Sequence, residues 1–482
     1  MPNLEPNKII EEDIRLKLNS IKSSTALIEK HVKRPGLGTC VKFFSKISEW
    51  KHLFNSFGEK THPILKKAGD RNIITDQTDL IKTSVELLEK ELSLHNKIVY
   101  EAVQGLWEAK RKNKKVVLLL APFYNQESLK DGYFKRIKAI DDILGEDILK
   151  VYVAPLSLDS DFDEVSKVSI DDSHIKLTLN IEDPEKTGFL KLIGQVSDLI
   201  YYHSVAFVNA TTLNMDKMQI LDLHGAVPEE LILQGNPTQA AIESEKERVA
   251  ISKVEYVICV TNAMAAYLTE KYPQSKAKHI ILPIMDDYIY DTKKVINEKK
   301  YSEGKPNIMY AGGLQQWQMI PKMQEVIEKT LSQFNYTIVV PDTPAFLDYW
   351  KEKSVPSIEV ISGQRETVKK VCLKAHYGFL LREDILVNRV SCPTKLIEYL
   401  TYGVVPVLLS EAIGDFSFFG MKYIKLKDFA SGNIPTEERR LEMVKENYAC
   451  LAGIMDQYTK GKSELRAIIN NFPESYSPPV LG

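Results

Sequence analysis

From Lys114 onward, short apolar segments of the length of a buried strand alternate with amphipathic segments of helical length. The strand candidates of the first series are KKVVLLLAPFY, ILKVYVAP, DLIYYHSVAFV, MQILDLHG, YVICVTN and HIILPI. Helical patterns such as DGYFKRIKAIDDIL, ESEKERVAISK and NAMAAYLTEKY lie between several of them. Continuously apolar strands are buried on both faces, and strands that are joined by helices run parallel. The alternation therefore predicts a mostly parallel α/β sheet with helices on both faces.

A second series of the same kind follows a charged segment, YDTKKVINEKKYSEGKPN, which is predicted to be a linker. Its strand candidates are NIMYAGG, YTIVVPD, IEVISG, YGFLLRE, VVPVLLS and KYIKLK. Two successive α/β units predict two Rossmann-like lobes, with a ligand site in the cleft beyond the carboxyl ends of the strands. We place the N-terminal lobe at residues 113–290, the C-terminal lobe at residues 300–435, and final helices with a tail at residues 436–482.

Residues 1–112 show helical periodicity and almost no strand pattern, so an added N-terminal helical region is expected. One helix candidate, TDLIKTSVELLEKELSLHNKIVYEAVQGLWEAKRK, has apolar residues at heptad spacing. This stripe fits either an oligomer contact or a helix that packs on its own chain. The basic, aromatic segment CVKFFSKISEWKHLFNSF fits either peripheral contact with an anionic membrane or a solvated helical subdomain.

Composition and charge exclude several classes of protein. The 482 residues contain 63 Lys and Arg against 65 Asp and Glu, a balance that gives no support to nucleic-acid binding. The five cysteines include no CxxC pair, which favours a reducing compartment and disfavours disulfides or a zinc site. The first residues, MPNLEPNKIIEEDIRLK, contain no secretory signal, and no apolar segment reaches the ~20 residues of a bilayer span. A cytoplasmic location follows, with any contact at the inner face of the cell membrane being peripheral.

The segment NRVSCPTKLIEYLTYGVVPVLL, residues 388–409, contains the strongest candidate site. Pro393 suits the start of a helix and Gly403 its end, and the free N–H groups of a helix start favour an anion. Lys395 adds a positive charge in the first turn, and Glu398 lies roughly 7–9 Å beyond the cap. That layout fits a nucleoside diphosphate with its ribose on Glu398. The simpler interpretation pairs Glu398 with Lys395 at the surface.

This stretch resembles the donor-binding signature of GT-B glycosyltransferases of the family 4 type (glycosyl transferases group 1). LLREDILVNRVSCPTKLIEYLTYGVVPV resembles a subgroup with an LLR–VN–PTK–EY–G–PV pattern. YAGGLQQWQ resembles its glycine turn, LDLHGAVPEEL its D-HG-PEE segment, and VICVTNAMAAYLTEKY a third segment with a similarly placed Met and KY. The likeness extends over Val116–Leu426 and implies the GT-B fold, an α/β architecture of two Rossmann-like lobes that face a cleft.

The resemblance also implies roles for individual residues. The implied catalytic residues are His224, Arg382 and Lys395, and the implied donor-binding residues are Gly312, Gly313, Trp317, Asn388, Arg389, Ser391, Thr394 and Glu398. In this scheme Glu398 binds the ribose, while Arg382 and Lys395 bind the pyrophosphate. His224 faces the donor sugar, and the loop 388–391 contacts the donor through backbone N–H groups. Trp317 stacks on a base or acceptor, or belongs to the core.

Two departures from the family pattern stand out. Val390 occupies the position of the first Glu of the E-x7-E pair, and the segment after the glycine turn, LQQWQMIPK, contains no Arg. Arg382 or Arg389 is expected to supply the positive charge of the Arg that is absent after the glycine turn. The acidic segment LDSDFDE is interpreted as a solvated loop, and no metal site is expected, because it lacks the glycine and closing Glu of a calcium loop. Asp131 and Gly132 either line the acceptor side or form a turn.

These observations predict a metal-independent hexosyltransferase without a cofactor. It would move a sugar from a nucleotide diphosphate-sugar to a glycan or lipid-linked saccharide in cell-surface polysaccharide biosynthesis, and the resemblance to family 4 implies retention. Two alternatives stay open: a nucleotide-sugar epimerase of GT-B-like fold, and a non-catalytic nucleotide-sugar-binding partner of another transferase. The partners expected are the donor, the acceptor and, through residues 1–110, a membrane surface or a second subunit.

Overall fold

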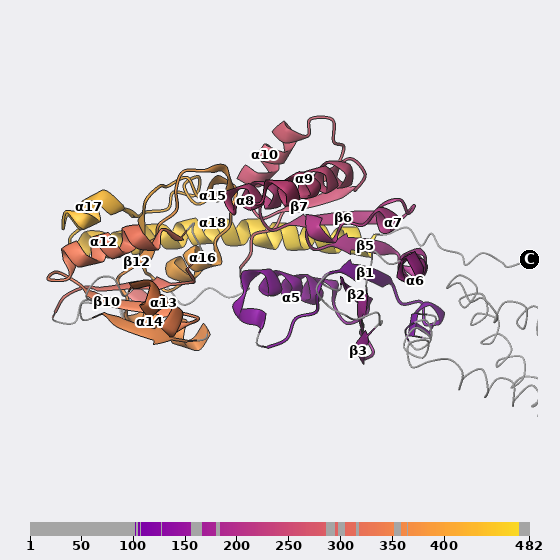
Figure 1. The fold of residues 1–482 in the computed structure, drawn as a ribbon, viewed down its shortest axis with the longest axis horizontal. Coiled ribbons are helices and arrows are strands. Elements are labelled where there is room, and N and C mark those ends of the chain that lie inside the picture. The colour runs from indigo at the N-terminus through magenta and orange to yellow at the C-terminus, as the bar shows by residue number, and fades with distance from the viewer. Residues whose placement is uncertain are drawn as a thin grey trace, which may run out of the picture. The chain divides into compact units, whose positions relative to one another are not determined.

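A computed structural model describes residues 102, 105, 106, 108–126, 128–155, 166–179, 184–285, 295, 296, 304–314, 318–350, 358–363 and 365–471 (Figure 1). The predicted heptad helix, apart from its last turns, and the basic aromatic segment lie outside the described residues, as do the acidic loop LDSDFDE and most of the predicted linker. The chain divides into two compact units, Met1–Lys114 with Pro155–Val196, and Lys115–Ala154 with Ser197–Gly482.

The first unit contains a β-hairpin that the sequence analysis did not predict. Strands β3 (Ser166–Ile170) and β4 (His174–Leu179) pair antiparallel, and helix α6 (Pro184–Val196) follows. Asp171 stabilises the turn, because its Oδ1 accepts hydrogen bonds from the backbone N–H groups of Ser173 at 2.9 Å and His174 at 2.7 Å. Alternate residues of β4 are buried, which is the period of a strand with one covered face.

The second unit contains a parallel sheet in the order β2-β1-β5-β6-β7-β8, in which every pairing is parallel. Its strands are β1 (Val116–Leu120), β2 (Leu149–Pro155), β5 (Leu199–Tyr202), β6 (Met218–Leu223), β7 (Tyr256–Cys259) and β8 (Lys278–Ile281). Its helices are α5 (Gly132–Leu144), α7 (Ala210–Leu213), α8 (Val227–Leu233), α9 (Pro237–Ile251) and α10 (Asn262–Lys271). The predicted N-terminal α/β series is confirmed.

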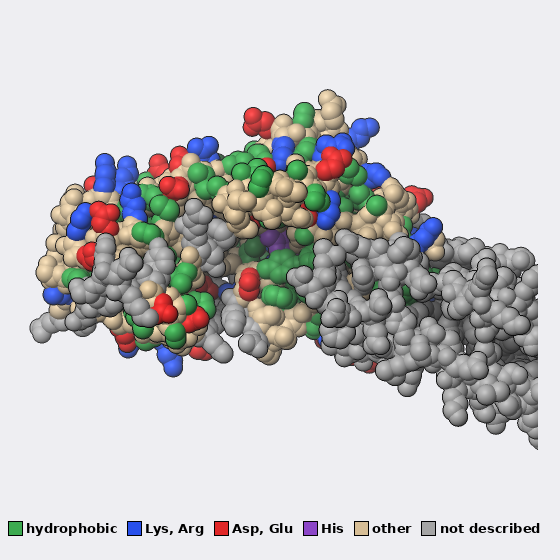
Figure 2. Space-filling model, in the orientation of Figure 1, with side chains coloured by type: hydrophobic (Ala, Val, Ile, Leu, Met, Phe, Trp, Pro, Cys, Tyr) green, Lys and Arg blue, Asp and Glu red, His purple; other side chains and the backbone are tan. Residues whose placement is uncertain are grey.

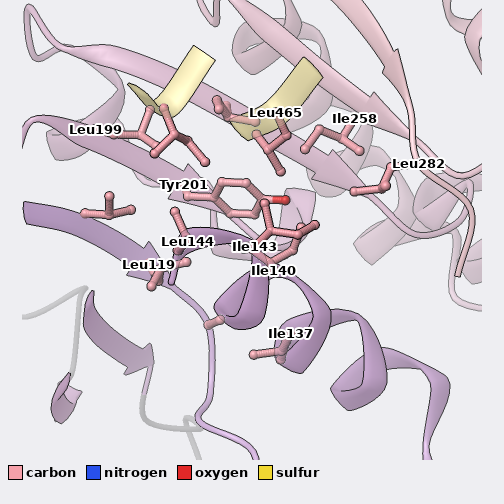
Figure 3. Close-up of a cluster of buried hydrophobic side chains, with 14 of the residues drawn as sticks. Leu119, Ile137, Ile140, Ile143, Leu144, Leu199, Tyr201, Ile258, Leu282 and Leu465 are labelled. Atoms are coloured by element: carbon pink, nitrogen blue, oxygen red, sulfur yellow. The ribbon is translucent and has the colours of Figure 1, made fainter. Parts of the chain in front are cut away.

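The core of this sheet explains why its strands are continuously apolar. All five residues of β1 and all four of β5 are buried. On one face of the sheet, Leu119, Leu199 and Tyr201 pack against Ile137, Ile140, Ile143 and Leu144 of α5 (Figure 3). Burial of each such side chain contributes about 1.5–3 kcal/mol relative to exposure.

A second parallel sheet in the same unit has the order β11-β10-β9-β12-β13-β14. Its strands are β9 (Asn307–Ala311), β10 (Asn335–Val340), β11 (Glu359–Ser362), β12 (Tyr377–Leu380), β13 (Val405–Leu408) and β14 (Ile424–Lys425). Its helices are α12 (Ile320–Thr330), α13 (Thr343–Trp350), α14 (Arg365–Lys374), α15 (Leu386–Arg389), α16 (Thr394–Thr401) and α17 (Leu426–Ala430). This sheet is the predicted C-terminal lobe.

Helix α18 (Glu437–Asn470) connects the two sheets (Figure 1). It contacts α16 and β13 of the second sheet and then α5 and β8 of the first. Leu465 and Ile469 belong to the core cluster of the first sheet, so the chain returns there after it completes the second. Gly461 permits this approach, because a Cβ atom at that position would lie 2.1 Å from the carbonyl oxygen of Ile281. In the described part of the chain, no helix is long and apolar enough to cross a membrane.

Candidate active site

Helix α16 is the element on which the predicted site depends. It follows β12 and α15, begins at Thr394 and ends at Thr401, and Gly403 takes a positive φ of 64° just beyond it. The backbone N–H groups of Gly403 and Val404 bond to the carbonyl groups of Leu400 and Tyr399, which closes the helix as predicted. Pro393 is the N-cap rather than the first helical residue, a shift of one position, and no side chain caps this helix start.

Arg382 lies two residues beyond β12 and is partly buried. Its Nη1 donates two long hydrogen bonds, 3.4 Å to Asn388 Oδ1 and 3.2 Å to Ser391 Oγ, and its Nε has no partner. Burial lowers the pKa of Arg382, and the nearby Glu230 carboxylate acts in the opposite direction. A guanidinium that is desolvated but poorly bonded favours an anionic ligand with oxygens at the right positions.

Lys395 lies in the first turn of α16, where the charge of Arg382 acts on it. Its Nζ donates to Gln318 Oε1 at 3.0 Å and lies 4.3 Å from the centre of the Tyr310 ring. Burial and the charge of Arg382 lower the pKa of Lys395 to about 7, although Glu398 acts in the opposite direction. Within the described residues, neither Lys395 nor Arg382 forms an ion pair with a carboxylate. Arg382 and a protonated Lys395 would together favour an anion at this position.

The glycine turn after β9 lies against this cation pair. A Cβ atom on Gly312 would lie 2.5 Å from Lys395 Nζ and 2.9 Å from Tyr310 Oη, so only glycine permits the observed packing. Tyr310 Oη in turn donates to the carbonyl of Gly313 at 2.7 Å. The sequence predicted that these glycines allow close approach to phosphates, and the structure shows that Gly312 already allows close approach of Lys395. Trp317 lies outside the described residues.

Glu398 faces the other lobe. Its Oε1 accepts a hydrogen bond from Lys135 Nζ of helix α5 at 3.0 Å, and the two side chains are only 26% and 16% exposed. Glu398 therefore pairs with Lys135 and not, as the simpler interpretation predicted, with Lys395. The two helix starts also meet, because a Cβ atom on Gly132 would lie 3.2 Å from Thr394 Cγ2. Glu398 thus lies between the lobes, and its role at a ribose stays a prediction.

Residues 388–391 differ from the prediction. They were expected to form a loop with free backbone N–H groups, but the N–H groups of Asn388, Arg389, Val390 and Ser391 are all bonded to carbonyl groups within the segment 385–391. A helical turn uses these donors internally, so they are not available to a ligand. The Arg389 side chain pairs with Asp384 at 2.6 Å and is 56% exposed, whereas Asn388 and Ser391 contact Arg382.

His224 follows β6 and lies above a buried ionic network. Asp222 accepts from Arg136 through both oxygens, at 2.9 and 3.0 Å, and from Tyr201 Oη at 2.7 Å. Burial opposes ionisation of Asp222, but the charge of Arg136 holds its pKa well below the usual range. His224 Nε2 is 3.4 Å from Asp222 Oδ2, and both ring nitrogens lack a hydrogen-bond partner. Figure 2 shows a histidine side chain within a recess that is lined by apolar side chains.

His203, Asp222 and His224 are also the group in the described residues that could hold a metal ion. His203 is completely buried, and burial lowers its pKa to about 3, so its imidazole is neutral, as a metal requires. Asp222, however, already binds the guanidinium of Arg136 with both oxygens. A divalent cation would lie beside that charge, so the residues fit a metal poorly.

Several residues of the cleft were missed by the sequence analysis. Asp415 of the C-terminal lobe accepts hydrogen bonds from the backbone N–H groups of Asn262 at 2.7 Å and Ala263 at 3.0 Å, at the start of α10. Thr261 Oγ1 donates to the carbonyl of Val390 at 2.7 Å. These bonds hold the two lobes together beside α15. Near Lys135, the sequence analysis had named Asp131 and Gly132 as residues that line the acceptor side or form a turn, and Asp131 caps the start of α5.

The architecture is that of the GT-B fold: two parallel α/β sheets in which helices alternate with the strands. Two solved structures of this fold are similar to the chain. One is described as trehalose-6-phosphate from E. coli bound with UDP-2-fluoro glucose, with 13% identity, a TM-score of 0.50, and coverage of 75% of this chain and 100% of that chain. The other is Anabaena Alr3699/HepE in complex with UDP and glucose, with 12% identity, a TM-score of 0.50, and coverage of 74% and 99%.

What these structures share with the chain is the fold, which confirms the predicted GT-B architecture. No family model matches the sequence, and no curated protein matches it.

Proposed function

We propose that this protein is a glycosyltransferase that moves a hexosyl group from a nucleotide diphosphate-sugar to an acceptor hydroxyl. The observation that carries the proposal is the pair Arg382, after β12, and Lys395, in the first turn of α16, which are both partly buried and have no carboxylate partner among the described residues. Glu398 lies one turn further along the same helix. Two proteins of the same fold, by their descriptions, contain UDP with glucose or a fluoro-glucose.

In the proposed mechanism, the protein stabilises the leaving diphosphate. Arg382, protonated Lys395 and the start of α16 would bind the charge that grows on the phosphate oxygens as the glycosidic bond breaks. Glu398 would exchange Lys135 for the two ribose hydroxyls. His224 would face the sugar from the other lobe, with its Nε2 3.4 Å from Asp222 Oδ2. The reaction would proceed with retention, as the family resemblance implies, and would need no metal because the cations supply the charge.

The acceptor we propose is a glycan or lipid-linked saccharide in cell-surface polysaccharide biosynthesis, with the enzyme in the cytoplasm. Residues 1–110 would bring it to the inner face of the membrane. Deletion of residues 1–75 is expected to reduce binding to anionic liposomes while donor binding stays unchanged. Unchanged liposome binding would favour the alternative, a solvated helical subdomain.

The first test is a thermal-shift screen with UDP-, GDP- and ADP-hexoses, because a ligand that binds only the native state raises the melting temperature. A donor should stabilise the wild type but not the Arg382→Ala/Lys395→Ala variant. Arg248→Ala/Lys329→Ala is the matched control, because it removes two exposed cations of the same types. Full activity in excess EDTA would support the metal-free mechanism, and a loss that manganese restores would reject it. Conversion of the nucleotide sugar without an acceptor would indicate an epimerase instead.

A further inference from the structure

The adjacent residues Glu229 and Glu230 of α8 have different surroundings. Glu229 Oε1 accepts from Lys271 Nζ at 2.7 Å, and Lys271 also pairs with Glu247 at 2.8 Å, so Glu229 belongs to a network within the N-terminal lobe. Within the described residues, no side-chain hydrogen bond or ion pair reaches the Glu230 carboxylate. A partly buried carboxylate without a protein partner keeps acceptor sites for water or for a ligand.

The Glu230 carboxylate lies inside the candidate site. Its charge acts on Arg382 of the other lobe, and α8 contacts α15, which carries Asn388. Burial raises the pKa of Glu230, while Arg382 acts in the opposite direction. The carboxylate also packs over the residue after His224, because a Cβ atom on Gly225 would lie 2.2 Å from Glu230 Oε1. The glycine of the HG pair is therefore what allows Glu230 to occupy this place.

We propose that Glu230 accepts hydrogen bonds from hydroxyl groups of the donor's hexosyl ring and so determines which sugar is bound. The inference rests on the proposed function. If the diphosphate occupies Arg382 and Lys395, the sugar that is bonded to it would lie near Arg382, where the charge of Glu230 acts from the other lobe. Glu230 is the unpartnered carboxylate at this place, and it can bind a pair of neighbouring hydroxyls.

This assignment also accounts for a departure from the family pattern. Val390 stands where the resemblance places a Glu, and its side chain is only 2% exposed while its carbonyl accepts from Thr261. The C-terminal lobe thus offers no carboxylate at position 390. Glu230 brings a carboxylate to the neighbourhood of α15 from the opposite lobe.

The test compares each nucleotide sugar with its own nucleotide by calorimetry: UDP-glucose with UDP, GDP-mannose with GDP, and ADP-glucose with ADP. Glu230→Gln keeps the shape but removes the charge. It should weaken binding of the nucleotide sugar by about tenfold to a hundredfold, as expected for charged hydrogen bonds. Binding of the nucleotide alone should be equal or tighter, because a negative charge near Arg382 is lost. Glu245→Gln, an exposed Glu in an ion pair on α9, should change neither.

A second variant separates position from charge. Gly225→Ala leaves every charge in place but displaces the flexible Glu230 carboxylate, and it should produce the same selective loss of affinity for the nucleotide sugar. If Glu230→Gln weakens the nucleotide and the nucleotide sugar equally, or neither, the role of Glu230 is refuted while the proposed function stands. If the wild type binds no nucleotide sugar of the panel, both proposals fail.

Discussion

Lys395 should take up a proton when the donor binds. In the free protein, burial and the charge of Arg382 lower the pKa of this amine to about 7. A diphosphate next to Lys395 would restore a pKa near the ordinary value of about 10.4. At pH 8 only about a tenth of the free protein would be protonated at Lys395, so donor binding should take up about 0.9 proton, falling to about 0.5 at pH 7 and about 0.1 at pH 6.

The affinity should change with pH in the same sense. Above pH 7 the free protein must first bind a proton, so the dissociation constant should rise towards tenfold per pH unit, or about 1.4 kcal/mol. Without a donor the sign is opposite. The folded protein binds fewer protons than the unfolded chain between pH 7 and about pH 10, so this group makes the free energy of unfolding increase with pH over that window.

Proton uptake can be measured by isothermal titration calorimetry at pH 8 in buffers of different ionisation enthalpy. A nucleotide sugar is the suitable ligand, because its doubly esterified diphosphate does not titrate near neutral pH. The Lys395→Arg variant is the control, since a guanidinium stays charged and should bind without proton uptake. Uptake below about 0.2 proton by the wild type at pH 8 would refute the argument that Lys395 is largely neutral before the donor binds.

Three further perturbations test the surrounding contacts. Glu398→Ala should lower turnover by about a hundredfold, near 3 kcal/mol, and wild-type kinetics would reject its role at the ribose. Lys135→Ala should tighten donor binding by about two- to fivefold, because the donor no longer breaks an ion pair of about 0.5–1 kcal/mol; weaker binding would show that Lys135 contacts the donor. Arg136→Met should cost about 3–5 kcal/mol in urea unfolding, because it leaves Asp222 charged and buried, and a loss below about 1 kcal/mol would contradict the assigned network.

Local patterns predicted the main architecture. The apolar segments that became β1, β5 and β12 are buried throughout, and their spacing with amphipathic helices indicated two parallel sheets. Gly403 marked the end of α16 because a positive φ is needed there. The order of the motifs on these elements predicted the GT-B fold from the sequence. The hairpin β3–β4 was not predicted, because its strands have only five and six residues, and so short an alternation of polar and apolar residues gives a weak pattern.

The positions of individual donors and acceptors required the tertiary structure. The sequence predicted a loop at 388–391, but these residues form a helical turn whose N–H groups bond to carbonyl groups of the same segment. The side chain of Arg389 pairs with Asp384. Whether such a segment is an open loop or a turn depends on which local hydrogen bonds are formed, and sequences of this composition allow both.

The sequence alone determined which segments are buried, because the pattern of apolar residues is a property of neighbours in the chain. It also predicted that Lys395, Arg382 and Glu398 belong to one site. Only the tertiary structure decided what opposes them. Lys135 lies 263 residues from Glu398, and the charge of Glu230 acts on Arg382 from the other lobe. No periodicity links such positions, because the Coulomb interaction acts through space, and the folding of both sheets and the return of α18 are what bring the charges together.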